Sequence, residues 1–196
     1  MRTIKLILLI IFSLNYVESY SQFNGENKEI SLSIYNNTSG LPFVQFEPIY
    51  LGGEIGFTFL QNDKPITTQK ISAQLGFFNH KLIANAPYLK STYSYQLKIL
   101  RTIGINVYAG LGYIHAFYPG DAYSFNTSQG SYEKKQLNQG FLLTNAGFGI
   151  SYLKTKRISP YIKYELMMAG SDTERLFTNF HFGISIKLNK TENENE

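Results

Sequence analysis

Apolar residues take every second position along most of this chain, and that period constrains the fold more than any other feature. The stretch 180–189, FHFGISIKLN, alternates Phe, Phe, Ile, Ile and Leu with His, Gly, Ser and Lys. Successive side chains of a strand point to opposite sides, so a period of two predicts a strand with one apolar and one polar face. A soluble barrel would turn the apolar face inward, whereas a membrane barrel would turn it outward to lipid.

The same alternation recurs in eight segments, and no segment has a convincing helical period. The expected strands are about 28–36, 47–61, 66–81, 88–101, 103–117, 139–153, 157–169 and 175–188. These segments predict an all-β fold, an eight-stranded antiparallel up-and-down transmembrane β-barrel.

The connections between these segments alternate in length. Short turns are expected at 62–65, 101–102 and 154–157, and longer links at 37–46, 82–87, 118–138 and 170–174. Outer-membrane barrels have short periplasmic turns and long external loops. With eight strands, both termini fall on the short-turn side, which predicts that both are periplasmic. The first strand should pair with the eighth, because an open edge in lipid leaves backbone groups unsatisfied.

The polar faces are rich in glycine and poor in charge. Charged residues make up 16% of the chain, against about 25% in ordinary soluble proteins. Glycine would weaken a strand that faces water. Inside a narrow eight-stranded barrel, glycines such as Gly110 and Gly147 would instead make room for bulky neighbours such as Tyr108, Tyr161 and His181.

The apolar faces run for four to six alternate positions without a charge, which suits lipid, where a mid-bilayer charge costs roughly 2–4 kcal/mol. Tyr88, Tyr93, Tyr113 and Tyr152 are expected to form an aromatic girdle near the strand ends. The alternative is a soluble lipocalin-like barrel that binds a lipid or a small apolar ligand. It explains the alternation equally well, but not the uncharged, glycine-rich polar face.

The N-terminal segment predicts a secretory signal peptide over residues 1–21. Arg2 and Lys5 precede a nine-residue apolar run at 6–14, and small residues follow at Ser19 and Ser21. The run is shorter than the ~20 residues that a spanning helix needs. We therefore expect export across the inner membrane, an outer-membrane barrel at 22–189 and a polar periplasmic tail at 190–196.

Three stretches, PIYLGGEIGF (48–57), VYAGLGYIHAFYPG (107–120) and NAGFGISY (145–152), resemble uncharacterised "outer membrane protein beta-barrel" families. The chain is similar in plan to the small OmpA-type and OmpX-type barrels of Gram-negative cells, over nearly its whole length. The resemblance implies fold and location rather than chemistry, and partners that include outer-membrane lipid and the barrel assembly machinery. Such barrels often end on an aromatic residue that aids assembly, whereas this chain ends in the polar sequence NKTENENE (189–196).

The polar register collects several ionisable residues, which we expect to lie in the lumen. They are Glu54, Lys70, Lys98, Lys163, Glu165 and His181. Buried charges must be paired, so the first interpretation is an ion-pair network that fills the barrel. The alternative is a narrow channel or transporter for ions or small polar solutes.

No pattern in the sequence predicts an enzyme, a metal site or a cofactor. The chain has no cysteine and three isolated histidines. His181 and Ser185 share a strand face but lie roughly 13 Å apart, too far for a nucleophile and its base. No cluster has metal-ligand spacing. The mild net charge of +4 is scattered, so nucleic acid is not expected as a partner.

The long link 117–139 is the best candidate for contact with the outside, because loops carry function more often than scaffolds do. Its aromatic residues are Phe117, Tyr118, Tyr123, Phe125 and Tyr132. The sequence thus predicts a monomeric barrel with an envelope structural role, or a surface-interaction role towards a surface ligand or an envelope protein.

Overall fold

The computed structural model describes residues 28–39, 49–80, 84–99, 102–126, 131–155, 157–170 and 176–188. The predicted signal peptide and the predicted tail lie outside the described residues. The strands are β1 (Glu29–Ser39), β2 (Leu51–Asp63), β3 (Thr67–His80), β4 (Ala84–Ile99), β5 (Ile103–Asn126), β6 (Ser131–Tyr152), β7 (Ile158–Ala169) and β8 (Leu176–Lys187). In this described part of the chain, no helix has the length and hydropathy to span a membrane.

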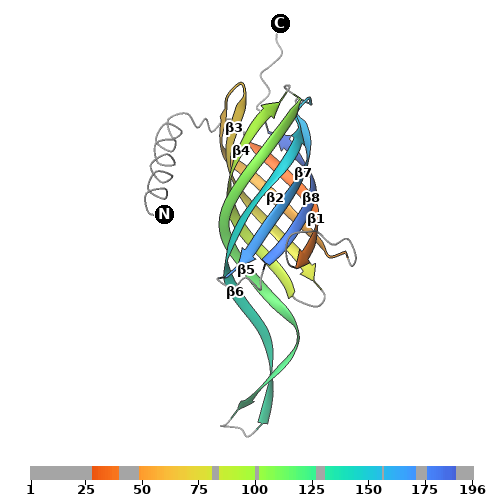
Figure 1. Ribbon diagram of the computed structural model, residues 1–196. Helices are drawn as coiled ribbons and strands as arrows, with labels where there is room; N and C mark the ends of the chain where they lie inside the picture. Colours follow the sequence, from red (N-terminus) through yellow and green to blue (C-terminus); the bar gives the residue numbers. More distant parts are fainter. Residues whose placement is uncertain are drawn as a thin grey trace, which may run out of the picture.

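Each strand pairs antiparallel with the next, and β1 pairs with β8, so that the sheet closes into one barrel (Figure 1). The closing register runs from Glu29 opposite Lys187 to Ser39 opposite Phe177. Closure leaves no open edge along the barrel wall. The predicted all-β, eight-stranded up-and-down barrel is therefore confirmed, including the pairing of its first and last strands.

The apolar faces point away from the barrel axis. Large side chains from several strands are strongly exposed, including Ile34 (66%), Leu51 (65%), Phe148 (57%) and Phe182 (52%). In the opening stretch, His181 is fully buried while Phe182 is exposed, which fixes the orientation of β8. The soluble lipocalin-like alternative is wrong, because it requires these apolar side chains inside.

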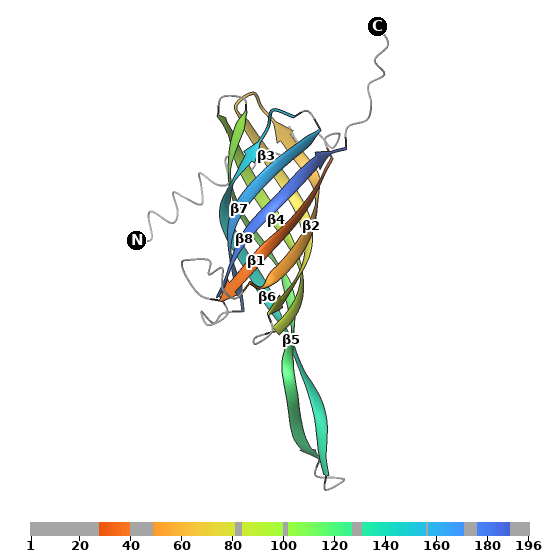
Figure 2. The same ribbon diagram turned by 90° about the vertical axis from the view of Figure 1, so that its right-hand side faces the viewer.

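Strands β5 and β6 continue far beyond the rest of the barrel as a two-stranded hairpin, which both views show (Figures 1 and 2). The expectation of a loop over 118–138 is therefore wrong for most of its length. Pro119 and Gly120 suggest a break, but the ladder absorbs them as an irregularity between Phe117 and Asp121. Beyond it, the β-favouring aromatic residues resume the pairing, with Phe125 opposite Tyr132.

Four lumen tyrosines each lie directly opposite a glycine on the neighbouring strand. The pairs are Tyr35–Gly52, Tyr88–Gly76, Tyr108–Gly147 and Tyr161–Gly183. A Cβ built on any of these glycines would overlap the facing tyrosine ring. The glycines therefore provide the space that the rings occupy, as the sequence analysis expects for Tyr108 and Tyr161.

One tyrosine expected in the outer girdle lies inside. Tyr88 is 2% exposed, whereas Tyr93, Tyr113 and Tyr152 are at least 40% exposed. Tyr88 shares the even-numbered register of the inward residues of β4, so strand parity decides its side and its position near a strand end does not.

Candidate functional site in the barrel lumen

The lumen is closed at the hairpin end by a layer of apolar side chains, the apolar plug. The plug consists of Phe78, Ala86, Ile114, Leu143, Met167, Ala169 and Phe177, none more than 6% exposed. The rings of Phe78 and Phe177 lie 5.2 Å apart between centroids. Residues of six strands thus seal this end, because the inward positions near the loop ends of β3 to β8 are apolar.

Next to the plug lies a cluster of four buried charges, the charge cluster. Lys90 Nζ lies 2.6 Å from Glu165 Oε1 and 2.8 Å from Glu54 Oε2. Lys163 Nζ lies 2.6 Å from Glu54 Oε1. Two carboxylates and two ammonium groups face one another, so the cluster is neutral as a unit. Such pairing is what allows charges to remain away from water.

Neutral side chains complete the hydrogen bonds of the two carboxylates. The Tyr88 hydroxyl donates to Glu54 at 2.8 Å, and Asn145 Nδ2 donates to Glu165 at 2.8 Å. A buried carboxylate oxygen that lacks a hydrogen-bond donor raises the free energy of the folded state, so these two donors stabilise the buried ion pairs. The charge cluster is therefore held by a network rather than by isolated pairs.

His181 links the charge cluster to Ser33 on β1. Its Nε2 lies 3.2 Å from Glu165 Oε2, and its Nδ1 lies 3.2 Å from the Ser33 hydroxyl. A carboxylate can only accept, so Nε2 donates to Glu165, and in the neutral imidazole Nδ1 accepts from Ser33. The serine that contacts His181 is thus Ser33 on β1. The sequence pattern pointed only to Ser185, which lies on the same strand as His181.

This Ser–His–Glu chain has the connectivity of a nucleophile, a base and an orienting acid. Its surroundings give it a structural character, because Glu165 already pairs with Lys90 and Ser33 is only 8% exposed. Ser33 is also not among the residues that line the polar cavity of the lumen. The arrangement positions His181.

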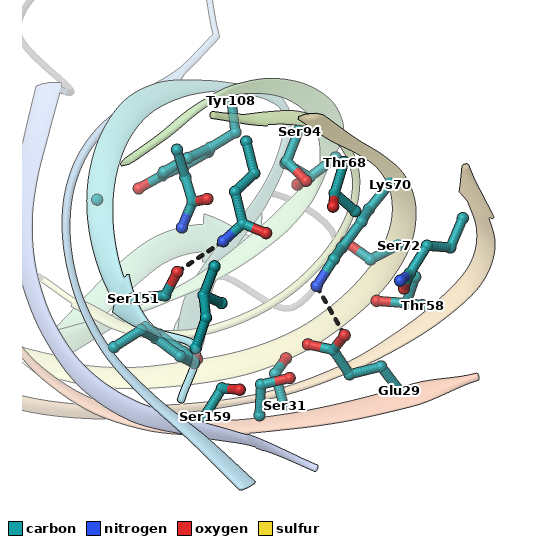
Figure 3. Close-up of a pocket in the computed structure, with 18 of the residues that line it drawn as sticks. Glu29, Ser31, Thr58, Thr68, Lys70, Ser72, Ser94, Tyr108, Ser151 and Ser159 are labelled. Atoms are coloured by element: carbon teal, nitrogen blue, oxygen red, sulfur yellow. Dashed lines mark hydrogen bonds and ion pairs between the residues drawn. The ribbon is translucent and has the colours of Figure 1, made fainter. Parts of the chain in front are cut away.

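Beyond the charge cluster, the lumen opens into a polar cavity of about 490 Å³, the vestibule (Figure 3). It reaches the short turns, since Pro65 and Leu153 are part of its lining. Figure 3 shows hydroxyl, amide and charged side chains converging on it from the surrounding strands. Lys70 pairs with Glu29 at 2.6 Å on its wall.

At the turn end, Asp63 gathers three donors. Lys98 Nζ lies 2.6 Å from its carboxylate, Gln61 Nε2 donates at 2.9 Å, and the Thr68 hydroxyl donates at 2.5 Å. Partial burial raises the pKa of Asp63, but these hydrogen bonds and the Lys98 charge outweigh it and hold the pKa below its ordinary value. Asp63 therefore stays ionised at a lower pH than an ordinary aspartate.

The structure separates the six predicted lumen residues into two groups. Glu54, Lys163, Glu165 and His181 meet in the charge cluster, whereas Lys70 and Lys98 lie in the vestibule. Sequence reasoning missed Lys90, the residue that bridges both carboxylates. It also missed Glu29 and Asp63, the partners of the two vestibule lysines. Lys90 and Lys98 both lie at even-numbered positions of β4, so the alternation in the sequence already placed Lys90 on the inward face.

The predicted contact residues of the hairpin end are only partly described. Phe117 and Tyr118 are half-buried on β5, while the side chains of Tyr123, Phe125 and Tyr132 lie outside the described part. A surface role for these five residues stays a prediction. Within the described residues, no group of three or more His, Asp or Glu side chains is arranged to hold a metal ion.

The fold places this protein in the class of closed eight-stranded up-and-down β-barrels, with an apolar exterior and side chains that block part of the lumen. No family model and no curated protein matches the sequence. Among solved structures, the chain is similar to Neisserial surface protein A (NspA), with 10% identity, a TM-score of 0.51 and coverage of 85% of this chain and 99% of that one.

Two further solved structures are similar at lower TM-scores. A de novo designed transmembrane β-barrel has 12% identity and a TM-score of 0.48, and the match covers 84% of this chain and 98% of the designed chain. Ail of Yersinia pestis has 10% identity and a TM-score of 0.48, with 83% and 97% covered. At such identities the likeness concerns the fold alone.

Proposed function

We propose that the protein is an integral outer-membrane barrel with a filled lumen, which serves the envelope in a structural or surface-interaction role. The observation that carries this proposal is the combination of an apolar exterior with a lumen that the apolar plug and the charge cluster block. In water, the exposed Ile, Leu, Val and Phe side chains would form an apolar surface far larger than soluble monomers carry. In lipid the same surface is solvated, and the closed ladder satisfies the backbone.

Strand length supports the same location. A transmembrane strand needs about 9–11 residues, and the shortest strand, β1, has 11. A heat-modifiable gel shift of the refolded protein in detergent micelles would test the proposal. We expect a compact species when unheated and an unfolded species when boiled. A chain that remains monodisperse without detergent would contradict the proposal.

The orientation that we propose places the hairpin outside the cell and the short turns and both termini in the periplasm, after removal of the signal peptide at 1–21. It is supported by the short-turn rule of outer-membrane barrels and by the even number of strands. An epitope inserted at 127–130 should be labelled by antibody on intact cells, whereas an epitope after residue 196 should be labelled only after permeabilisation. The reverse pattern would overturn the orientation.

A channel function is the less favoured alternative, because the apolar plug and the charge cluster obstruct the lumen in series. In planar bilayers we expect no stable single-channel steps over a wide voltage range. Steps that change on Lys98→Ala or Lys163→Ala would instead establish a conducting path. We also expect no release of acyl chains from labelled lipid A, in keeping with a non-catalytic role.

The surface-interaction role is assigned to the β5–β6 hairpin, which extends furthest from the barrel. In the register of the ribbon, Phe125 lies opposite Tyr132 and Tyr123 opposite Lys134. Replacement of 120–136 by a short turn should leave the gel shift intact and abolish binding to the surface ligand or envelope protein that we propose as the partner. Unchanged binding by the truncated barrel would remove the hairpin from the proposal.

A further inference from the structure

The vestibule has the dimensions and the lining of a small-molecule site. Its volume of about 490 Å³ falls within the roughly 300–1,000 Å³ of ligand pockets. Serine, threonine, asparagine and glutamine side chains dominate the wall. Three of the serines, Ser31, Ser185 and Ser159, are register neighbours across β1, β8 and β7 and form a continuous hydroxyl row.

Two buried polar atoms of this wall lack a protein partner. The Oε1 of Gln61 and the Oγ of Ser185 belong to residues that are 4% and 7% exposed. Within the described part of the chain, neither atom has a hydrogen-bond partner. Buried polar atoms are normally bonded. Both atoms are covered by the protein, so a ligand in the vestibule bonds to them only when their side chains turn toward the cavity. Gln61 Oε1 can only accept, which calls for a ligand that donates.

The mouth of the vestibule is positively charged. Lys28, Lys64, Lys154 and Arg157 are exposed at the same turn end, and Lys187 is part of the lining. The acidic residues of the lining, Glu29 and Asp63, are already paired with Lys70 and Lys98. Among the described residues, Lys187 pairs with no carboxylate. The described charges at this end therefore leave a net positive excess, which attracts ligands of the opposite sign.

We propose that the vestibule binds a small anion that also carries several hydroxyl groups, the chemistry of a sugar phosphate. The anionic group lies near Lys187, and the ligand hydroxyls donate to Gln61 Oε1 and exchange hydrogen bonds with the serine row. The ligand enters from the turn end and leaves by the same end, because the charge cluster closes the other side.

The test is a titration of the full chain, refolded in detergent micelles, with glucose 6-phosphate, glucose and inorganic phosphate, followed by calorimetry. We expect saturable one-to-one binding of glucose 6-phosphate, at least tenfold tighter than that of glucose or of phosphate. Lack of saturation with all three compounds would overturn the proposal. Equal affinity for phosphate and glucose 6-phosphate would overturn its polyol part.

Variants locate the site. Ser185→Val and Lys187→Met should each weaken binding about fivefold or more, as expected for the loss of one hydrogen bond or one charge contact. Lys134→Met removes the same charge from β6 in the hairpin, at the opposite end of the barrel from the vestibule, and should leave the affinity unchanged. Ser72→Phe fills the cavity without altering its charge and should abolish binding, with the gel shift as the check on folding. Retention of affinity in Ser72→Phe would exclude the vestibule.

Discussion

Tyr88 lies directly opposite Gly76 across β3 and β4, and its ring occupies the space that a Cβ on Gly76 would need. The hydroxyl of the same tyrosine donates to Glu54 at 2.8 Å. The glycine thus sets the position of a ring that in turn holds a carboxylate of the charge cluster. Tyr88 thus connects the packing at Gly76 to the position of the Glu54 carboxylate.

Gly76→Ala should destabilise the barrel by about 1–3 kcal/mol, because the added methyl group overpacks the site and displaces the Tyr88 ring. Urea unfolding in micelles measures the change. Gly53→Ala is the matched control, since Gly53 is exposed and a Cβ there would meet only the Ser33 carbonyl oxygen at 3.9 Å. Equal losses for the two variants would show that the Tyr88 contact is unimportant.

Lys90→Met should cost about 3–5 kcal/mol of unfolding free energy, because it leaves the charge cluster with an uncompensated buried carboxylate. Lys98→Met removes the ion pair between Lys98 and Asp63, whose side chains are 23% and 33% exposed. This loss should cost about 1 kcal/mol or less. The double variant Lys90→Met, Glu165→Gln restores neutrality and should lose less than the sum of its single changes. Strict additivity would argue against coupling within the cluster.

Asp63 should make the barrel less stable in acid. Its pKa is lower in the folded state than the unfolded value of about 3.9, so it contributes stability above that pH, and the contribution is lost as the pH falls through the folded pKa. The difference in unfolding free energy between the native chain and Asp63→Asn should therefore be larger at pH 7 than at pH 3. Comparing the two chains cancels the titration of the other carboxylates, and a difference that stays constant with pH would contradict the assignment.

Val107→Lys should cost roughly 2–4 kcal/mol, since Val107 is 53% exposed near the middle of the apolar band of β5 and a charge is most costly there. Ile66→Lys places the same charge in the β2–β3 turn and should cost at most about 1 kcal/mol. Folding yield into lipid vesicles, read by the gel shift, compares the two. A similar yield for both variants would mean that the band does not face acyl chains.

Strand parity was enough to predict the barrel, because each segment repeats the period of two for several positions and both faces have distinct compositions. Parity also places Glu54, Lys163, Glu165 and His181 inside. Pairing, by contrast, depends on the stagger between strands, which no local pattern encodes. The contact of Lys90 with Glu165, 75 positions away along the chain, required the structure.

Local signals misled the prediction at two places. The link 118–138 is expected to be a loop, yet the ladder resumes after a register irregularity between Phe117 and Asp121. Tyr88 near a strand end suggests a girdle residue, although its even-numbered position is the stronger evidence. In both cases the long-range ladder overrides a short motif that fits turns and interfaces in general.

The ion pairs of the charge cluster join strands that are never neighbours in the sheet: β4 with β2, β4 with β7, and β7 with β2. A sheet that has not yet curled round cannot make any of these contacts, however complete its hairpins are. Half-assembled forms would hold bare ammonium and carboxylate groups beside acyl chains, and that penalty disappears only when the first and last strands meet. The paired charges therefore favour the closed barrel over partly assembled forms.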